Sequence, residues 1–597
     1  MEAYHSMSGV IRRFYRTITR HRHHQFCLIL FLLFFASISE VFSIGSALPL
    51  LAILTEPERF FNNATLQPWF HQLGFNEPRE LLLPITLLFG FSALVAASMR
   101  LLLTWAITRI SFLVGADCSI EIYRRTLYQP YEVHCSRNSS EVINGIAVKI
   151  NAIVGMVFNV LSLVSSGFML VFIIGTLVFI NPIIAFTVFV GFGGIYIAIV
   201  LLNKNRLTIN SERVARQSTN SIQLLQEGLG GIRDVLIDGS QEIYCKLYTQ
   251  IDFPLRKAQA DNQFISQAPR YIIEALGMIF ISILTYFISR NAGVTSEVIP
   301  VLGAMAMGAQ RLLPVLQQAY GSWTGILGYK ASLEDALKLL EQPLPDYLKK
   351  EEIFPIEFKR SISLRDVDFC YGNDGSNVLN KISINITKGE RIGFVGKTGS
   401  GKSTLIDIIM GLLLAKGGEL RVDSQVINDS NAHSWQRHIS HVPQNIYLAD
   451  GTIEENIAFG IPREQIDSTR VREAAQLAQI DGTIQMWPHK YKTYVGERGV
   501  RLSGGQRQRI GIARALYKRA NLIIFDEATS ALDAETEKSV MRGIETLGDE
   551  VTLLIIAHRV STLKNCSKII QLGAGEGCKI ISYEELINEH ENSFNSN

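Results

Sequence analysis

The stretch RIGFVGKTGSGKSTLIDIIMGLL, residues 391–413, decides the fold of the C-terminal half of the chain. An apolar run leads into a glycine-rich loop and an apolar-periodic run leaves it, which predicts a strand, a loop and a helix. The loop has the spacing Gly396-x4-Gly401-Lys402-Ser403. Such a loop turns backbone N–H groups toward phosphate oxygens, while its lysine reaches the terminal phosphates and its serine can ligate Mg²⁺. The helix N-terminus adds a favourable dipole, so the stretch predicts an α/β domain that binds phosphates.

A second apolar run, NLIIFDE at residues 521–527, ends in two carboxylates. Taken alone, an apolar run that ends in Asp-Glu is a common end of a buried strand. Beside a phosphate loop, it predicts a pair of acidic groups next to the phosphates. Asp526 is expected to hold the Mg²⁺ shell, and Glu527 to polarise the attacking water.

The stretch RLSGGQRQR, residues 501–509, supplies a second glycine-rich helix start. Ser503 is suited to cap that helix, which accounts for the local pattern alone. The domain already has a phosphate loop, however, and a second anion-binding surface needs another explanation. With this stretch, residues 360–590 resemble the nucleotide-binding domain of the ATP-binding cassette (ABC) superfamily.

The resemblance implies a role for each matching residue. It implies ATP and Mg²⁺ as cofactors, with catalysis by Glu527, His558 and Lys402. The ATP-binding set that it implies is Tyr371, Gly396, Gly399, Ser400, Gly401, Lys402, Ser403, Thr404 and Gln444, with Ser403, Gln444 and Asp526 at the Mg²⁺. It further implies that Ser503, Gly504, Gly505 and Gln506 contact ATP across a dimer, and that Asp533 is a dimer contact.

The N-terminal half has the composition of a membrane domain. Over the whole chain, mean hydropathy is +0.18 and 19% of residues are charged, against about 25% in soluble domains, and most of the hydrophobic excess lies before residue 330. A bilayer needs about 20 mostly apolar residues per helix. Such runs are found near 26–54, 81–103, 152–180, 182–203, 271–289 and 298–319, which predicts six transmembrane helices. The first run is too long for a signal peptide and lacks a cleavage site, so it is expected to be retained.

We therefore expect an α-helical membrane domain with six spans, followed by an α/β P-loop cassette. The predicted boundaries are 1–335 for the membrane domain, 336–360 for a linker and 361–597 for the cassette. The polar stretches 104–150 and 204–268 are expected to be helices that extend into the cytoplasm.

Charge asymmetry predicts the orientation in the cytoplasmic membrane. Five arginines lie between residues 12 and 22, whereas the loop 55–80 has two arginines against four glutamates. Basic loops stay inside, so the N-terminus and the cassette are expected in the cytoplasm.

Composition also excludes some classes of protein. The formal charge is +2, which argues against a nucleic-acid binder that acts through bulk charge. Seven cysteines form no C-x-x-C, so neither a disulfide framework nor a zinc site is indicated. A soluble ABC ATPase would lack the apolar half, and an ATP-gated channel would not need an intact Glu527.

One membrane domain followed by one cassette resembles an ABC exporter half-transporter that acts as a homodimer. Within its apolar half, Arg100, Arg270 and Arg311 fall at similar predicted depth. They are expected either to pair with Glu40 and Glu274 or snorkel as structural charges, or to line a basic cavity for a phosphate head group.

Three stretches, FASISEVFSIGSALPL (35–50), APRYIIEALG (268–277) and RLLPVLQQAY (311–320), are similar to those of bacterial lipid-linked oligosaccharide flippases. This resemblance implies an anionic, lipid-anchored substrate. Flippases of lipid A-type lipids and exporters of other glycolipids, peptides or drugs remain alternatives. The loop 55–80 resembles the external amphipathic helix of these flippases, with a folded cap as the alternative.

Overall fold

The computed structural model describes residues 7–55, 57–62, 67–72, 74–180, 182–291, 298–349, 356–372, 377–529, 531–548, 550–557, 559–573 and 577–595. The chain divides into two compact units. The membrane unit comprises Met1–Gln129 and Ser136–Pro343, and the ATP-binding unit comprises Pro130–Cys135 and Leu344–Asn597. The short segment Pro130–Cys135 therefore packs with the second unit, although it lies between helices of the first.

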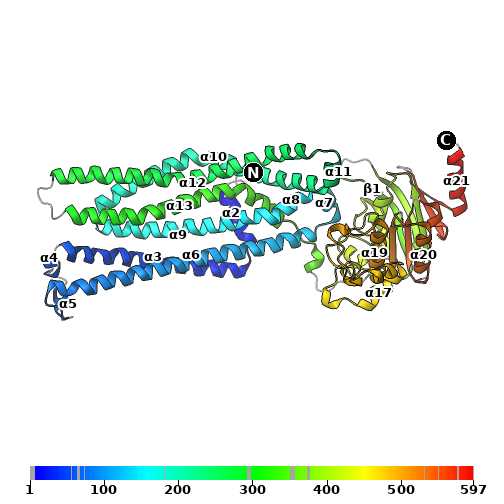
Figure 1. Ribbon diagram of the computed structural model, residues 1–597, viewed down its shortest axis with the longest axis horizontal. Coiled ribbons are helices and arrows are strands. Elements are labelled where there is room, and N and C mark those ends of the chain that lie inside the picture. The colour runs from blue at the N-terminus through cyan, green and yellow to red at the C-terminus, as the bar shows by residue number, and fades with distance from the viewer. Residues whose placement is uncertain are drawn as a thin grey trace. The chain divides into compact units, whose positions relative to one another are not determined.

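Long helices that lie side by side build the membrane unit (Figure 1). They are α3 (Arg20–Thr55), α6 (Leu82–Leu127), α9 (Ile150–Ile180), α10 (Pro182–Gly230), α12 (Gln241–Asn291) and α13 (Val298–Leu340). Shorter helices of this unit are α2 (Met7–Thr17), α4 (Pro57–Phe61), α5 (Gln67–Gln72), α8 (Ser139–Asn144) and α11 (Ile232–Ile237). Helix α7 (Tyr131–Ser136) belongs to the second unit, except for its last residue. Helix α3 packs along α6, α9 along α13, and α10 along α12. At 1.5 Å per residue the 49-residue α10 is roughly 70 Å long, more than twice the hydrocarbon thickness.

Three helical segments of the described chain are long and apolar enough to cross a membrane: Arg20–Leu54, Pro78–Leu127 and Ser139–Thr176. They contain the first two predicted spans and most of the third, 152–180. The other three predicted spans lie in α10, α12 and α13, where many side chains fall outside the described residues. The count of six therefore stays a prediction.

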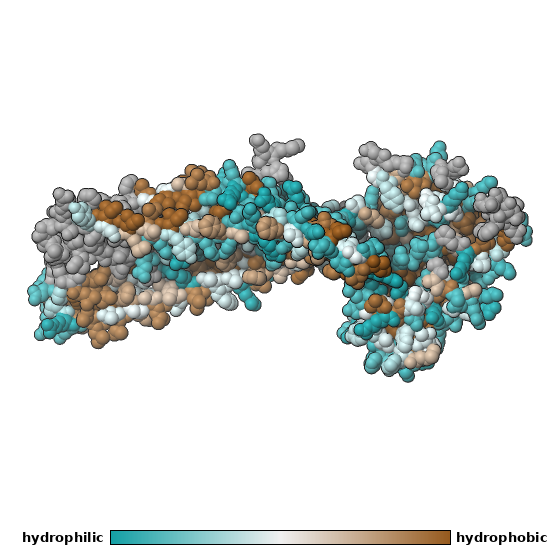
Figure 2. All heavy atoms as spheres, turned by 45° about the horizontal axis from the view of Figure 1, so that its top comes forward, coloured by the Kyte–Doolittle hydropathy of each residue, from teal (hydrophilic) through white to brown (hydrophobic). Residues whose placement is uncertain are grey.

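The surface of the membrane unit carries large apolar side chains (Figure 2). Phe91 and Leu101 of α6 are 69% and 74% exposed, and Phe31 of α3 is 63% exposed. In water, apolar surface of this extent is unfavourable, whereas in a bilayer it meets acyl chains. The exposure of these residues therefore fits a lipid-facing surface.

The loop 55–80 folds as a cap over the ends of α3 and α6. Phe61 of α4 is buried and stacks on Phe70 of α5, with ring centroids 5.9 Å apart. Phe61 joins a small core with Ile53 and Leu81. Trp69 remains 65% exposed, and Leu66 and Leu73 lie outside the described residues. Among described residues, the folded cap accounts for most of the aromatic face.

Two sheets form the core of the ATP-binding unit. The larger has the strand order β10-β9-β3-β8-β7-β6, and the smaller has the order β2-β1-β4-β5. The strands of the larger sheet are β3 (Arg391–Gly396), β6 (Ile439–Val442), β7 (Leu522–Asp526), β8 (Thr552–Ile556), β9 (Lys568–Leu572) and β10 (Cys578–Ile581). Those of the smaller are β1 (Ser361–Phe369), β2 (Leu379–Thr387), β4 (Gly417–Val422) and β5 (Gln425–Val426).

The larger sheet is parallel except for β10, and this arrangement positions the site. Strand β8 is buried at all five positions, as expected for a parallel strand covered on both faces. The helices that matter for the site are α14 (Lys402–Ile409), α19 (Gly504–Tyr517) and α20 (Ala534–Glu545). Because parallel strands end at one edge, the loops after β3, β7 and β8 gather there.

Candidate active site

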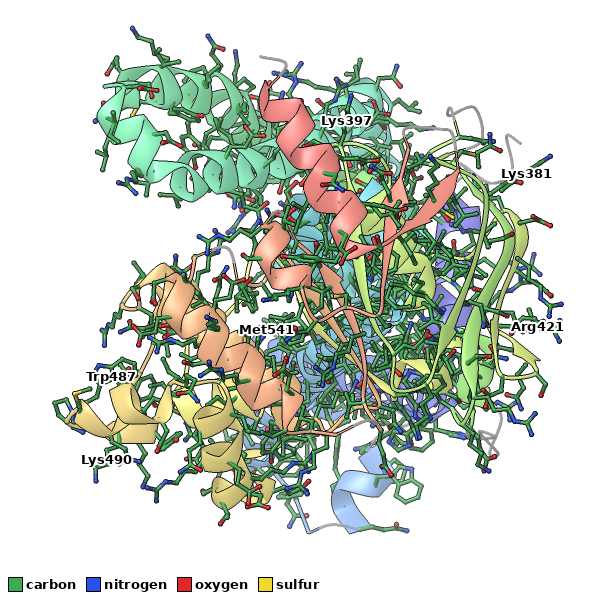
Figure 3. All side chains as sticks on the ribbon, turned by 90° about the vertical axis from the view of Figure 1, so that its right-hand side faces the viewer. Lys381, Lys397, Arg421, Trp487, Lys490 and Met541 are labelled. Atoms are coloured by element: carbon green, nitrogen blue, oxygen red, sulfur yellow. The ribbon has the colours of Figure 1, made fainter. Side chains whose placement is uncertain are left out.

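The phosphate loop connects β3 to α14 and has backbone angles that require glycine. Gly401, the N-cap of α14, has φ +89°, and a Cβ there would lie 2.8 Å from Leu379. A Cβ on Gly396 would lie 2.6 Å from the carbonyl oxygen of Leu572. Both positions therefore exclude larger residues on steric grounds. Lys397, which belongs to this loop, is labelled in Figure 3.

Two polar groups of this loop are suited to an anion. The Lys402 ammonium donates to the carbonyl oxygens of Gly396 at 2.8 Å and Lys397 at 3.0 Å, which holds it across the loop. The Ser400 hydroxyl is buried and has no hydrogen-bond partner among the described residues. A buried hydroxyl without a partner is costly, and a phosphate oxygen would satisfy it. The loop therefore fits a bound nucleotide.

Two acidic residues follow one another at the end of β7. Asp526 is half-buried, and burial together with the charge of Glu527 raises the pKa of its carboxyl, while Lys402 lowers it. Burial and the nearby Asp526 also raise the pKa of Asp407 on α14 to about 6. The carboxylate of Asp526 and the hydroxyl of Ser403, which lies in the first turn of α14, are oxygen ligands of the kind that Mg²⁺ prefers. The donor set therefore fits Mg²⁺.

Glu527 has an unusual backbone conformation, with φ +51°. Its N–H donates to the Ile556 carbonyl of β8 at 3.0 Å, and its carboxylate accepts from the Gln444 amide at 2.5 Å. Left-handed backbone at a non-glycine residue is strained, and such strain concentrates at functional sites. The structure therefore brings Gln444 and Glu527 together.

Tyr371 lies beside the phosphate loop, as expected of a residue that contacts the base of a nucleotide. Its hydroxyl is 3.1 Å from the Thr404 hydroxyl in the first turn of α14. Its ring meets Phe369 edge-on and is 46% exposed. An exposed aromatic face at this position is suited to stacking on a planar base.

The glycine-rich signature begins helix α19 with a capping box. The Ser503 N–H donates to the Gln506 side chain at 2.9 Å, and the Gln506 N–H donates to the Ser503 hydroxyl at 3.3 Å. Gly505 lies close to the loop after β7, since a Cβ there would be 3.2 Å from the carbonyl oxygen of Ala531. Ser503 is thus an N-cap, and its expected contact with ATP of a second chain stays a prediction.

Asp533 caps helix α20 in a similar way. Its carboxylate accepts from the Thr536 N–H at 2.9 Å and the Thr536 hydroxyl at 2.7 Å. These hydrogen bonds lower the pKa of Asp533. The side chain is exposed, and its role as a dimer contact stays a prediction. His558 lies outside the described residues.

One buried acid near the site was not predicted from the sequence. Glu537 on α20 bonds to Thr529 and Thr562 and forms an ion pair with Arg559. The sequence does indicate that Glu537 is buried, because Glu537, Val540 and Ile544 recur at helical spacing on one face of α20. An acid on an apolar face is a candidate for a structural or functional role.

Of the three arginines predicted to lie at similar depth in the membrane unit, two form ion pairs. Arg100 on α6 lies 2.7 Å from the carboxylate of Glu40 on α3, whose side chain is 3% exposed. Arg270 lies 2.8 Å from Glu274 within α12, and both side chains are largely exposed. Arg311 is a residue of α13, and its side chain is not described. Arg100 and Arg270 thus form the expected ion pairs with Glu40 and Glu274. Their expected role in a basic cavity for a phosphate head group stays a hypothesis.

Comparison with known proteins adds relatives for both units. Residues 379–530 match the family model of the ABC transporter. An ATP-dependent lipid A-core flippase of Cupriavidus metallidurans is 28% identical over 525 residues, which cover 83% of this chain and 84% of that protein. Its counterpart in Paraburkholderia xenovorans is 27% identical over 489 residues, 79% of each chain.

A solved structure shares the fold of both units. It is a bacterial Atm1-family ABC exporter with ATP bound, which has a TM-score of 0.76, covers 96% of each chain and is 20% identical. At this identity the likeness shows the fold. The predicted order of a helical membrane domain followed by an α/β cassette is confirmed. The chain thus carries an ABC transporter ATP-binding domain, has the fold of an ABC exporter, and couples ATP hydrolysis to transport.

Proposed function

We propose that this protein moves an anionic glycolipid across the cytoplasmic membrane, from the cytoplasmic leaflet outward, as a homodimer. The observation that carries the proposal is the similarity to lipid A-core flippases over about four fifths of both chains. That range is too long to lie within the ATP-binding unit alone. Lipid A-type lipids and lipid-linked oligosaccharides share an acidic head group with sugars on apolar tails, and both belong to the proposed class.

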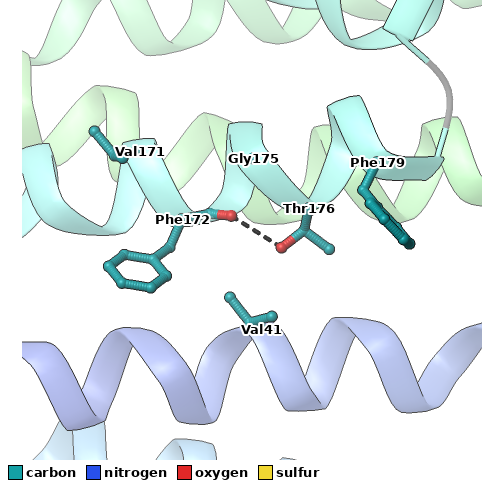
Figure 4. A pocket seen from close by; sticks show the side chains of 6 residues that line it. All are labelled: Val41, Val171, Phe172, Gly175, Thr176 and Phe179. Atoms are coloured by element: carbon teal, nitrogen blue, oxygen red, sulfur yellow. Dashed lines mark hydrogen bonds between the residues drawn. The ribbon is translucent and has the colours of Figure 1, made fainter.

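The membrane unit offers surfaces suited to both parts of such a lipid. An open apolar groove of about 390 Å³ lies between α3 and α9 (Figure 4). It is lined by Val41, Phe172, Thr176 and Phe179, and the Thr176 hydroxyl donates to the Phe172 carbonyl at 2.9 Å. The hydroxyl donor of Thr176 is therefore used within α9, the other lining side chains are apolar, and the groove suits an acyl chain.

The head group requires cationic donors at membrane depth. Arg100 is 46% exposed although Glu40 is buried, so only part of the guanidinium faces its carboxylate partner. A guanidinium has five N–H donors arranged for bidentate binding of phosphate. Arg100 and Arg270 can therefore bind phosphate while they keep an acidic neighbour, and we assign them this role with Arg311.

The ATP-binding unit supplies the energy through its own residues. Lys402, Ser400 and the N–H groups of the phosphate loop bind the phosphates, and Tyr371 holds the base. Gln444 positions Glu527, which accepts a proton from the attacking water. Mg²⁺, when bound by Ser403, Gln444 and Asp526, compensates the charge of the phosphates.

A dimer completes the site in this proposal. The signature helix of one chain meets the nucleotide on the phosphate loop of the other, so that ATP joins the two. Closure of the two ATP-binding units opens the substrate cavity between the membrane units to the outside. Hydrolysis of ATP returns this cavity to the inward-facing state. Two equivalent sites then drive each cycle.

Lipid-stimulated ATPase activity in nanodiscs tests the substrate class. Four additions are compared: a lipid A-type lipid, a polyprenyl-pyrophosphate glycan, a neutral glycolipid with equal tails, and a mixture of cationic drugs and peptides. Stimulation several-fold by either anionic glycolipid and not by the neutral one supports the proposal. Stimulation by drugs or peptides alone, or equally by the neutral glycolipid, contradicts it.

A further inference from the structure

Helix α20 places one carboxylate in the interior of the ATP-binding unit. The residue is Glu537, which is 7% exposed and lies on the same helix face as the fully buried Val540. Burying a carboxylate costs several kcal/mol unless it is paired and hydrogen-bonded. Nothing in the packing of α20 itself requires an acid here, so the partners of Glu537 explain its presence. Met541 marks this helix in Figure 3.

Both carboxylate oxygens of Glu537 are satisfied by donors from outside the helix. Oε1 accepts from the Thr529 hydroxyl at 2.9 Å and from the Thr562 hydroxyl at 2.6 Å. Oε2 accepts from the Arg559 guanidinium at 3.0 Å. Charge-assisted hydrogen bonds of this kind are stronger than neutral ones and fix geometry more tightly.

The three donors come from the two loops that carry the proposed catalytic residues. Thr529 lies two residues after Glu527, in the loop that follows β7. Arg559 follows His558 directly, and Thr562 lies in the short helix η7 (Val560–Leu563) after β8. Since β7 and β8 are neighbours in the sheet, one carboxylate joins the loops at the ends of both strands.

The same loop after β7 is held from two further sides. Arg559 also donates to the Leu532 carbonyl at 3.2 Å. The Ala531 N–H donates to the side chain of Gln508, which is buried on the signature helix α19. The loop that begins at Glu527 is therefore tied to η7 through Glu537 and Arg559, and to the signature helix through Gln508.

We propose that Glu537 is a positioning residue for ATP hydrolysis. Its carboxylate holds the loop that begins at Glu527 against the segment Arg559–Thr562, which follows His558 in the sequence. Both proposed catalytic residues then act on one substrate. The inference rests on the proposed roles of Glu527 and His558. Glu537 makes no contact with nucleotide in this account, and nucleotide binding through the phosphate loop does not depend on it.

The test compares two isosteric substitutions on the same helix in the full-length protein in nanodiscs. Glu537→Gln keeps the size of the side chain and removes the charge that Arg559 meets. Glu535→Gln is the matched control, because Glu535 is an exposed residue of the same first turn. The measured quantities are kcat and KM for ATP, with the thermal midpoint recorded for each variant.

The expected result is a split between the two kinetic constants. For Glu537→Gln we expect kcat to fall about tenfold or more, because a shift of the order of 1 Å at a catalytic group is costly. We expect KM for ATP within about twofold of wild type, since the phosphate loop is untouched. Glu535→Gln should match wild type in both constants.

A wild-type kcat in Glu537→Gln would overturn the inference, as would a fall in kcat explained wholly by raised KM or by unfolding at the assay temperature. If Glu537→Gln does not fold, Thr562→Val decides, since it removes one donor and keeps the ion pair. A reduced kcat at unchanged KM then supports positioning, and a wild-type kcat rejects it. Glu527→Gln, measured in parallel, distinguishes failure of the positioning inference from failure of the proposed function. Persistent hydrolysis in Glu527→Gln contradicts the proposed function, whatever Glu537→Gln does.

Discussion

The two units of this protein place their charged residues in opposite ways. In the ATP-binding unit, Asp526 and Glu527 lie at the end of β7, and Lys402 begins α14 after the loop that follows β3. Strands β3 and β7 are parallel strands of one sheet, with β8 between them, so their C-terminal ends lie at the same edge. In the membrane unit, Arg100 on α6 is paired with Glu40 on α3. Arg270 is paired with Glu274 on its own helix, α12. The charges of the first unit form a site before any ligand arrives, whereas those of the second neutralise one another.

This difference separates the residues that hydrolyse ATP from the residues that recognise the transported substrate. Hydrolysis of ATP is the same reaction for every substrate, so its residues can be fixed by rigid strands. Substrate recognition has to change during transport, and paired arginines can exchange an acid for a phosphate as the helices move. The largest effects of substitution should therefore fall in the ATP-binding unit on turnover, and in the membrane unit on stability and lipid response.

The largest expected effect is on turnover. Glu527→Gln should lower the ATP hydrolysis rate at least about 100-fold, because general base catalysis contributes roughly 10²–10⁴-fold. ATP binding should persist, since the phosphate loop and Tyr371 are unchanged. Steady-state ATPase activity measures the loss of hydrolysis, and equilibrium ATP binding measures whether binding is retained. Hydrolysis near the wild-type rate would remove Glu527 from the role of base.

The next effect is on the stability of the membrane unit. Arg100→Ala removes one cationic partner of the buried Glu40, which should cost up to about 3–5 kcal/mol or prevent insertion. Arg270→Ala breaks a pair between two exposed side chains one turn apart on α12, and it should cost less than Arg100→Ala because neither partner is buried in the protein. Thermal unfolding in nanodiscs of equal lipid composition measures the difference between the two variants.

The double variant Glu40→Gln/Arg100→Gln serves as the control for this pair. Since it removes both charges together, it should recover most of the stability that Arg100→Ala loses. Its stimulation by an anionic glycolipid should stay low if Arg100 binds the head group. Full stimulation in a folded double variant would show that Arg100 is a structural charge only.

A smaller effect concerns acid stability and belongs to the ATP-binding unit alone. Burial lowers the pKa of His441 on β6 to about 4. The folded value lies below the unfolded value of about 6.5, so the stability linked to neutral His441 is present above pH 6.5 and lost as pH falls through 4. The free energy of unfolding that is lost through this one group between pH 6.5 and 4 is roughly 3 kcal/mol.

Replacing this imidazole tests the assignment. His441→Phe should flatten the fall of the free energy of unfolding between pH 6.5 and 4 by about one proton. His489→Phe, at an exposed position, is the control and should keep the wild-type slope. An unchanged slope in His441→Phe would show that His441 does not titrate with an altered pKa.

The sequence predicted the parts of the site that depend on local pattern. The strand, loop and helix around Lys402 and the carboxylates at the end of β7 follow from apolar runs that end in glycines or acids. The cap at Ser503 also follows from a few neighbouring residues. Such features need no knowledge of distant contacts, and this is why they could be predicted.

The remaining features depend on contacts between distant segments. The bond between Gln444 and Glu527 joins residues 83 positions apart, and the bonds of Glu537 cross two loops. The pairing of Arg100 with Glu40 was one of two alternatives, because sequence alone gives no lateral distance between helices. The nature of the transported lipid depends on such lateral contacts as well.

The most direct test of the account is ATP-driven transfer of a labelled anionic glycolipid in proteoliposomes whose ATP-binding units face outward. Wild-type protein should move the lipid out of the outer leaflet only when Mg²⁺ and ATP are present, and Glu527→Gln should not. Transfer at the same rate in Glu527→Gln, or none in a wild-type preparation that hydrolyses ATP, would contradict the central claim.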